Sequence, residues 1–89
     1  MDETTQQTIP AITVQLFAGA AAEYGAESTT VHGSTLQEAL EDLLSAASPQ
    51  AAQVIARSSF LVGGVACTDR GRALADGDQL DVLPPFAGG

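Results

Sequence analysis

The residues best suited to chemistry stand at the end of the sequence, in the order Pro84, Pro85, Phe86, Ala87, Gly88 and Gly89. Proline fixes φ and pushes the residue before it toward extended backbone, so we expect residues 84–89 to leave the domain as a stiff tail. Glycine has no Cβ, and a Gly88-Gly89 end could therefore enter a channel too narrow for other residues. A free α-carboxyl group is ionised at neutral pH. The carboxylate of Gly89 is thus a nucleophile that could attack the α-phosphate of ATP held by a partner enzyme.

Alone, the diglycine is a weak signal, because at about 7 % glycine such an end arises by chance in roughly one chain in 200. The other reactive side chains are isolated in sequence. Cys67 has no histidine or basic neighbour, and we interpret it as a thiol within a strand. His32 has no second residue at metal-ligand spacing, and Asp76-Gly77-Asp78 is typical of a turn. We therefore expect no enzyme activity, bound metal or cofactor in this chain itself.

Charge indicates which partners suit the chain. Its 89 residues carry a formal net charge of −8, without lysine, and the basic residues are Arg57, Arg70 and Arg72. Nucleic acid and anionic membranes attract basic surfaces, so we expect neither as a partner. The charge favours protein partners with basic docking surfaces, although simple solubility explains it as well.

Cysteine use and the first residues bear on location. A single cysteine cannot form an internal disulfide, which fits a reducing compartment. The segment 1–10 is polar, without the basic and apolar stretches of a secretion signal, and we expect it to be disordered. No apolar run approaches the ~20 residues that span a bilayer. These features predict a cytoplasmic protein.

The first half of the chain predicts strand, helix, strand and helix. Ile12, Val14 and Leu16 alternate with polar residues, which indicates a half-buried strand. A short helix at 18–24 and a second strand at 27–31 follow. A Thr35-x-x-Glu38 capping box then opens the clearest helix of the sequence. Its apolar stripe, which we assign to the core, comprises Leu36, Leu40, Leu43, Leu44 and Ala47.

The second half predicts a helical turn, a hairpin and a last strand. Ser48-Pro49 should end the main helix, and a shorter helical turn is expected at 50–57. Residues 60–67 form a hairpin pattern around Gly63-Gly64, a pair suited to a type I′ turn. Leu80 and Val82 then alternate with polar residues. This order predicts an α+β domain over 11–83, with one main helix on a mixed sheet of four or five strands. Adjacent first and last strands would make it a β-grasp.

Phe17 and Leu83 need a separate explanation, because strand parity places both outside the core. If the first and last strands are neighbours, the two side chains form an apolar patch at the root of the tail, suited to partner docking. Packing against the N-terminal segment or a loop is the alternative. Phe86 could anchor in a partner pocket or fold back onto the sheet.

After Pro10 the sequence resembles the ubiquitin-like sulfur carriers of the molybdopterin-synthase small-subunit and thiamine sulfur-carrier group. The segments that carry the resemblance are 14–18, 33–36, 60–62 and, most specifically, 76–89. The proline pair before the diglycine is more similar to the molybdopterin branch. Three features depart from the family pattern: Gly63-Gly64 stands where many relatives have Asn-Gly or Asp-Gly, Phe86 stands where a smaller aliphatic residue is frequent, and lysine is absent.

The resemblance implies a β-grasp fold and a C-terminal glycine, here Gly89, that an E1-like enzyme adenylates with ATP. A sulfur donor, persulfide or sulfide, then converts the adenylate to a thiocarboxylate. In the molybdopterin branch the tail enters the large synthase subunit, which the resemblance implies as a second partner. Three alternatives stay open: a carrier for thiazole, cysteine, a thiolated metabolite or transfer RNA; a ubiquitin-like modifier joined through Gly89 to lysines; and a plain binding module with an incidental tail.

Overall fold

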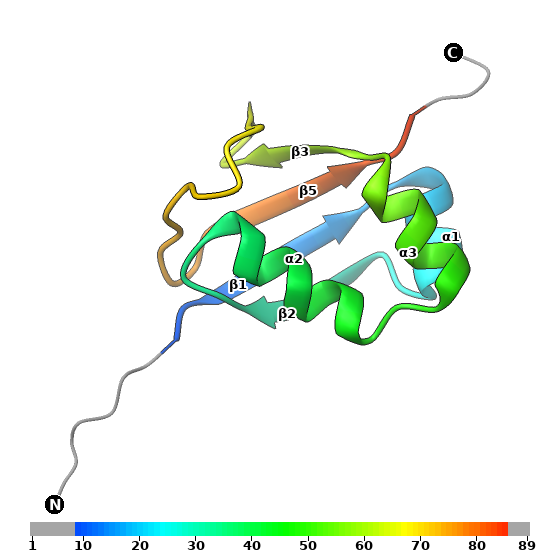
Figure 1. Ribbon diagram of the computed structural model, residues 1–89, viewed down its shortest axis with the longest axis horizontal. Coiled ribbons are helices and arrows are strands. Elements are labelled where there is room, and N and C mark those ends of the chain that lie inside the picture. Colours follow the sequence, from blue (N-terminus) through cyan, green and yellow to red (C-terminus); the bar gives the residue numbers. More distant parts are fainter. Residues whose placement is uncertain (1–8, 86–89) are drawn as a thin grey trace, which may run out of the picture.

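The computed structural model describes residues 9–85, which form a five-stranded sheet with helices packed against it (Figure 1). In chain order the elements are β1 (Ala11–Leu16), α1 (Ala18–Tyr24), β2 (Ser28–His32), α2 (Leu36–Ser45), α3 (Pro49–Ala56), β3 (Ser59–Val62), β4 (Val65–Ala66) and β5 (Gln79–Leu83). The strands lie in the order β2-β1-β5-β3-β4. β1 and β5 are parallel, and the other neighbouring pairs are antiparallel. The predicted mixed sheet with adjacent first and last strands is confirmed.

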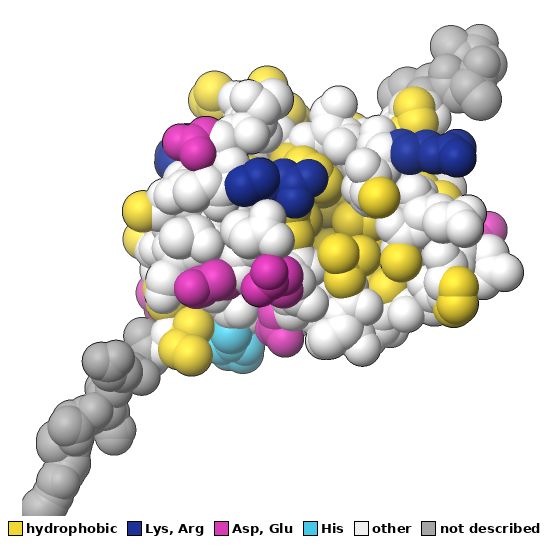
Figure 2. All heavy atoms as spheres, viewed as in Figure 1, with side chains coloured by type: hydrophobic (Ala, Val, Ile, Leu, Met, Phe, Trp, Pro, Cys, Tyr) yellow, Lys and Arg dark blue, Asp and Glu magenta, His cyan; other side chains and the backbone are white. Residues whose placement is uncertain are grey.

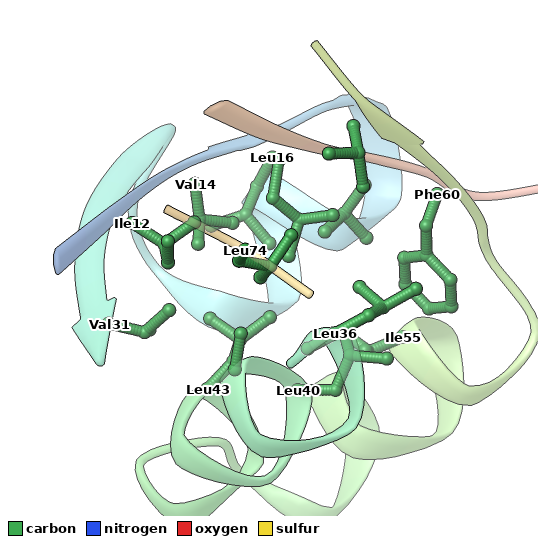
Figure 3. Close-up of a cluster of buried hydrophobic side chains, with 14 of the residues drawn as sticks. Ile12, Val14, Leu16, Val31, Leu36, Leu40, Leu43, Ile55, Phe60 and Leu74 are labelled. Atoms are coloured by element: carbon green, nitrogen blue, oxygen red, sulfur yellow. The ribbon is translucent and has the colours of Figure 1, made fainter. Parts of the chain in front are cut away.

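The hydrophobic core lies between one face of this sheet and the helices (Figures 1 and 3). The two central strands alternate as predicted, and their inward side chains are fully buried: Ile12, Val14, Leu80 and Val82. Leu36, Leu40 and Leu43 of α2 complete this core from the side of the helices (Figure 3). The assignment of Leu44 to the core was wrong, since it is 36 % exposed. Ala39 takes part instead, because it lies on the helix face between Leu36 and Leu43.

Side-chain caps fix where the two longer helices begin. Thr35 Oγ1 accepts from the Glu38 N–H at 3.2 Å, as the capping box predicts. Glu38 Oε1 accepts from the Ser34 N–H at 2.8 Å, one residue before the cap. Ser48 Oγ accepts from the Ala51 N–H at 3.1 Å, and Pro49 occupies the first turn. The second of these helices therefore starts one residue earlier than expected.

The segment between β4 and β5 contributes more than turns. Leu74 is 7 % exposed and lies within the core cluster, although the sequence predicted only a connection here. Its N–H donates to the Ser34 carbonyl at 2.9 Å, and the Leu36 N–H donates to the Arg72 carbonyl at 2.9 Å. The segment is thus held against the beginning of α2, and its one large apolar side chain closes the core on that side.

Asp76-Gly77-Asp78 is the turn predicted from the sequence. Ala11 N–H donates to Asp76 Oδ1 at 2.7 Å, and Gly77 N–H donates back to the Ala11 carbonyl at 2.9 Å. Ala75 N–H donates to Asp78 Oδ2 at 2.9 Å. These bonds join the beginnings of β1 and β5. Within residues 9–85, no cluster of histidine, cysteine, aspartate or glutamate could hold a metal ion, and no helix is long and apolar enough to cross a membrane.

Candidate functional site

Gly89, the residue expected to react, and the tail residues Phe86, Ala87 and Gly88 lie outside the described residues. Of the expected disordered segment 1–10, residues 1–8 lie outside them as well. The structure therefore defines the root of the tail and the surface around it.

The tail root is the end of β5, the central strand of the sheet. β5 pairs with β1 on one side and with β3 on the other, and it ends at Leu83. Pro84 is buried and Pro85 is exposed, so the chain reaches the surface of the domain at Pro85. Proline suits this position because it has no N–H that the end of a central strand would leave unpaired.

Phe17 and Leu83 lie side by side at this root. The parallel register pairs Leu16 with Val82, and the Phe17 N–H donates to the Val82 carbonyl at 3.2 Å. Both follow a buried residue in extended backbone, which turns their side chains away from the helices. Phe17 is 42 % exposed, and Leu83 is half-buried. The structure thus brings the two predicted residues together on the open face of the sheet.

A third apolar residue, Leu61 of β3, was missed in the sequence. It is half-buried between the buried Phe60 and Val62, and β3 pairs Ser59 with Leu83. Leu61 therefore faces the same side as Leu83. The alternation of β3 could have revealed it. Phe60 and Val62 face the core, so Leu61 between them faces the opposite side of the sheet. We call Phe17, Leu61 and Leu83 the apolar patch.

Asp81 lies within the same open face. It is half-buried on β5, paired in register with Gln15 of β1 and Leu61 of β3. Gln79 Nε2 donates to Asp81 Oδ1 at 2.9 Å. The sequence showed Asp81 only as the polar partner in the alternation of this strand.

A hollow of about 720 Å³ adjoins Phe17, between the end of β1, α1 and the segment 25–27 that leads into β2. The residues that line it include Phe17, Ala18, Ala21 and Gly25, and the ionisable one among them is Glu27. Such a wall of small apolar groups offers shape to a partner side chain.

Cys67 and His32 have structural surroundings. Cys67 is 8 % exposed in the core cluster, just after β4 rather than within a strand, and its Sγ lies 3.6 Å from the Asp69 carbonyl. His32 is the exposed last residue of β2, and its N–H donates to Asp42 Oδ2 at 2.8 Å. Neither side chain lies on the apolar patch.

The fold and its C-terminal central strand define a class, the small β-grasp carriers related to ubiquitin. The chain belongs to the ThiS family, whose model matches residues 14–89. No curated protein matches the sequence.

The solved structures that are similar to this chain include those of the following three proteins. The small archaeal modifier protein 1 of Haloferax volcanii is 29 % identical with a TM-score of 0.77, over 89 % of this chain and 99 % of that chain. A chain of the complex of subunits 1 and 2 of the Helicobacter pylori molybdopterin-converting factor is 20 % identical, with a TM-score of 0.67 over 89 % of this chain and 99 % of that chain. A chain of the Amycolatopsis orientalis BexX/CysO complex is 23 % identical, with a TM-score of 0.72 over 88 % of this chain and 99 % of that chain.

Membership of the family confirms the resemblance inferred from the sequence. It makes the chain a small carrier of the ThiS type, a sulfur carrier or ubiquitin-like modifier. Carriers of this family are non-catalytic and bind no cofactor. Two of the similar structures contain a second protein, so relatives of this chain form complexes with partner proteins.

Proposed function

We propose that this chain is a sulfur carrier whose Gly89 is converted to a thiocarboxylate, and that it serves as the small subunit of molybdopterin synthase. The observation that supports this most is the extent of the family match. It runs through residue 89 and so includes the proline pair and the diglycine. The complex of molybdopterin-converting factor subunits 1 and 2 supports the choice of pathway.

The proposed chemistry has two steps, each supplied by a partner. The Gly89 carboxylate attacks the α-phosphate of ATP on an E1-like enzyme and displaces pyrophosphate. Sulfide then attacks the carbonyl carbon of the acyl-adenylate and displaces AMP; a persulfide donor gives an acyl disulfide that a thiol must reduce. Activation splits one difficult substitution into two easier ones. This chain contributes the carboxylate, and the loaded sulfur passes to a pterin precursor on the large subunit.

The proposed division of labour follows the geometry at the tail root. Residues 11–83 form the carrier domain, and 84–89 form the reactive tail, with the apolar patch as the docking surface for both partners. The four residues after Pro85 reach at most ~13 Å when fully extended. The reacting centre of each partner should therefore lie within that distance of the surface that covers the tail root. Gly88 keeps the approach narrow, and Phe86 anchors the tail in the partner channel.

A second candidate function is protein modification. The 29 % identity to a small archaeal modifier protein, with a higher TM-score than the molybdopterin-converting factor gives, favours it. Activation would be the same, but a lysine ε-amine of another protein would attack the carbonyl carbon of the Gly89 acyl-adenylate and displace AMP. The two functions share adenylation and differ afterwards: a sulfur carrier passes on the sulfur of its thiocarboxylate, whereas a modifier is itself joined to its acceptor.

Sulfur transfer tests the leading proposal directly. The chain with a Gly89 thiocarboxylate is mixed with the molybdopterin-synthase large subunit and cyclic pyranopterin phosphate. We expect molybdopterin to form while the carrier returns to its carboxylate, both followed by mass spectrometry. A variant with one alanine added after Gly89, shown by intact mass to stay untrimmed, should be inactive. A competent thiocarboxylate that gives no molybdopterin would exclude this pathway.

Conjugation tests the second candidate. An N-terminally tagged chain is expressed in its own cells, and peptides with Gly89 amide-linked to lysine are sought by mass spectrometry. Such conjugates, absent when Gly89 is deleted, would establish a modifier. If the function of the chain in the cell survives deletion of Gly89, the chain is instead a binding module.

A further inference from the structure

Asp81 places a negative charge where the proposed docking surface is otherwise apolar. It lies on the central strand, directly opposite Leu61, and two residues before Leu83 on the same face. A partner that covers these two leucines must also cover Asp81. Residue Asp81 is half-buried without any partner, and a partner that covers it removes the water contact that its carboxylate still has.

The chain itself offers Asp81 only neutral neighbours across the strands. Its register partners are Gln15 and Leu61, and its hydrogen-bond donor is the amide of Gln79. Of the arginines, Arg70 donates to Gln37 Oε1 of α2 at 3.3 Å, and Arg57 follows directly after α3. Figure 2 shows arginine side chains on the face covered by the helices, which is the opposite face of the sheet. Within residues 9–85 no arginine donates to the Asp81 carboxylate, so a positive charge against it would come from a partner.

The physical cost of covering this residue decides what can bind. Enclosing a carboxylate without an opposite charge beside it costs several kcal/mol. This cost exceeds the free energy that one good apolar contact contributes to binding. A surface with an arginine at the matching place recovers that cost, because a guanidinium can donate two parallel hydrogen bonds to a carboxylate. An apolar or acidic surface of the same shape is rejected.

We propose that Asp81 selects the partner of this carrier: the E1-like adenylating enzyme binds the apolar patch with an arginine placed against the Asp81 carboxylate. This inference rests on the proposed function. The adenylating enzyme is the partner in question because sulfur transfer and protein modification both begin with it.

The test compares two variants that remove one negative charge each. Asp81→Asn keeps the side-chain shape and the oxygen that accepts from Gln79. Glu41→Gln removes a charge from the exposed surface of α2, on the opposite face. Dissociation constants for the adenylating enzyme of the same organism are measured by calorimetry between low and high salt. We expect Asp81→Asn to weaken binding about tenfold or more and to flatten the salt dependence, and Glu41→Gln to change it less than about twofold.

A third variant, Asp81→Leu, distinguishes the proposal from its rival, in which the partner surface opposite Asp81 is apolar. If the partner surface opposite Asp81 were apolar, Asp81→Leu would tighten binding; the proposal expects it to weaken binding more than Asp81→Asn does. Tighter binding by Asp81→Leu, or equal effects of Asp81→Asn and Glu41→Gln, would overturn the proposal. ATP–pyrophosphate exchange with the unaltered chain distinguishes failure of the proposed function from failure of the role of Asp81. If the unaltered chain supports no exchange, the proposed function itself is wrong. If it supports exchange, the binding results test the role of Asp81 alone.

Discussion

At the scale of single residues, exposure alone does not mark a docking residue. Val65 is 65 % exposed and Phe17 is 42 % exposed, yet only Phe17 lies beside the tail root. Val65 sits in β4, after the Gly63-Gly64 turn at the other end of β3. Phe17 and Val65 are both exposed and apolar, but only Phe17 lies near Pro85. Substitutions at the two positions therefore make a matched pair of variants.

Phe17→Ser should weaken binding to the adenylating enzyme about 30-fold, because a central aromatic contact is worth about 2 kcal/mol. Val65→Ser should change the dissociation constant less than about twofold. Both variants replace a side chain that is already exposed. The unfolding midpoint of each should therefore stay close to that of the unaltered chain. Surface plasmon resonance measures the affinities, and equal losses for the two would contradict a docking role for the patch.

Gly33 matters to the fold for a different reason, the close approach of two backbones. A Cβ at Gly33 would lie 2.5 Å from the Ala39 nitrogen and 2.8 Å from the Glu38 carbonyl carbon, both backbone atoms of α2. Gly33→Ala must therefore displace the first turn of that helix, and we expect it to lower the free energy of unfolding by about 2 kcal/mol or more.

Gly19→Ala is the matched control for Gly33→Ala. Gly19 lies within α1, and a Cβ there meets nothing within 4 Å. Alanine should raise the free energy of unfolding by about 0.5 kcal/mol through helix propensity. Urea titration of both variants measures the difference, and a stable Gly33→Ala protein would contradict the close approach.

At the scale of the elements, local patterns predicted what local forces determine. The alternation of β1 and β5, the capping box of α2 and the Gly63-Gly64 turn were each visible in sequence, and Gly63 and Gly64 have φ values of 60° and 83°. Leu74 was not visible, because its burial depends on a loop laid over α2 by tertiary hydrogen bonds. Of the site, Phe17 and Leu83 followed from parity, whereas their contact required the β1–β5 pairing. The roles of residues 86–89 stay predictions.

The turn before β5 gives a prediction at this scale. Asp76→Ala removes the acceptor of the Ala11 N–H and loosens the link between the beginnings of β1 and β5. We expect a loss of about 1 kcal/mol, which corresponds to a fall in Tm of roughly 4–8 °C for a domain of this size. Glu23→Ala, at an exposed position of α1, should change Tm by less than a third of that. Calorimetry that finds the same Tm for both would contradict the role of the turn.

At the scale of the whole molecule, the fold and the proposed chemistry occupy different parts of the chain. The buried hydrophobic residues run from Ile12 to Val82, and Pro84 closes the sheet end. The apolar patch belongs to the domain, while the reactive glycines follow it. The parallel pairing of β1 and β5 is what connects the two parts, because it sets Phe17 beside the strand that carries the tail.

This separation predicts that a chain ending at Pro85 folds normally and competes with the full-length chain for the adenylating enzyme. Its free energy of unfolding should match that of the full chain within about 0.5 kcal/mol, because the core is complete. It cannot be adenylated, yet it keeps Phe17, Leu61 and Leu83. We expect competitive inhibition of ATP–pyrophosphate exchange, with an inhibition constant within about tenfold of the full chain's dissociation constant. Adding Phe17→Ser to the shortened chain should abolish the inhibition. A shortened chain that folds but does not compete would mean that residues 86–89 supply most of the binding energy.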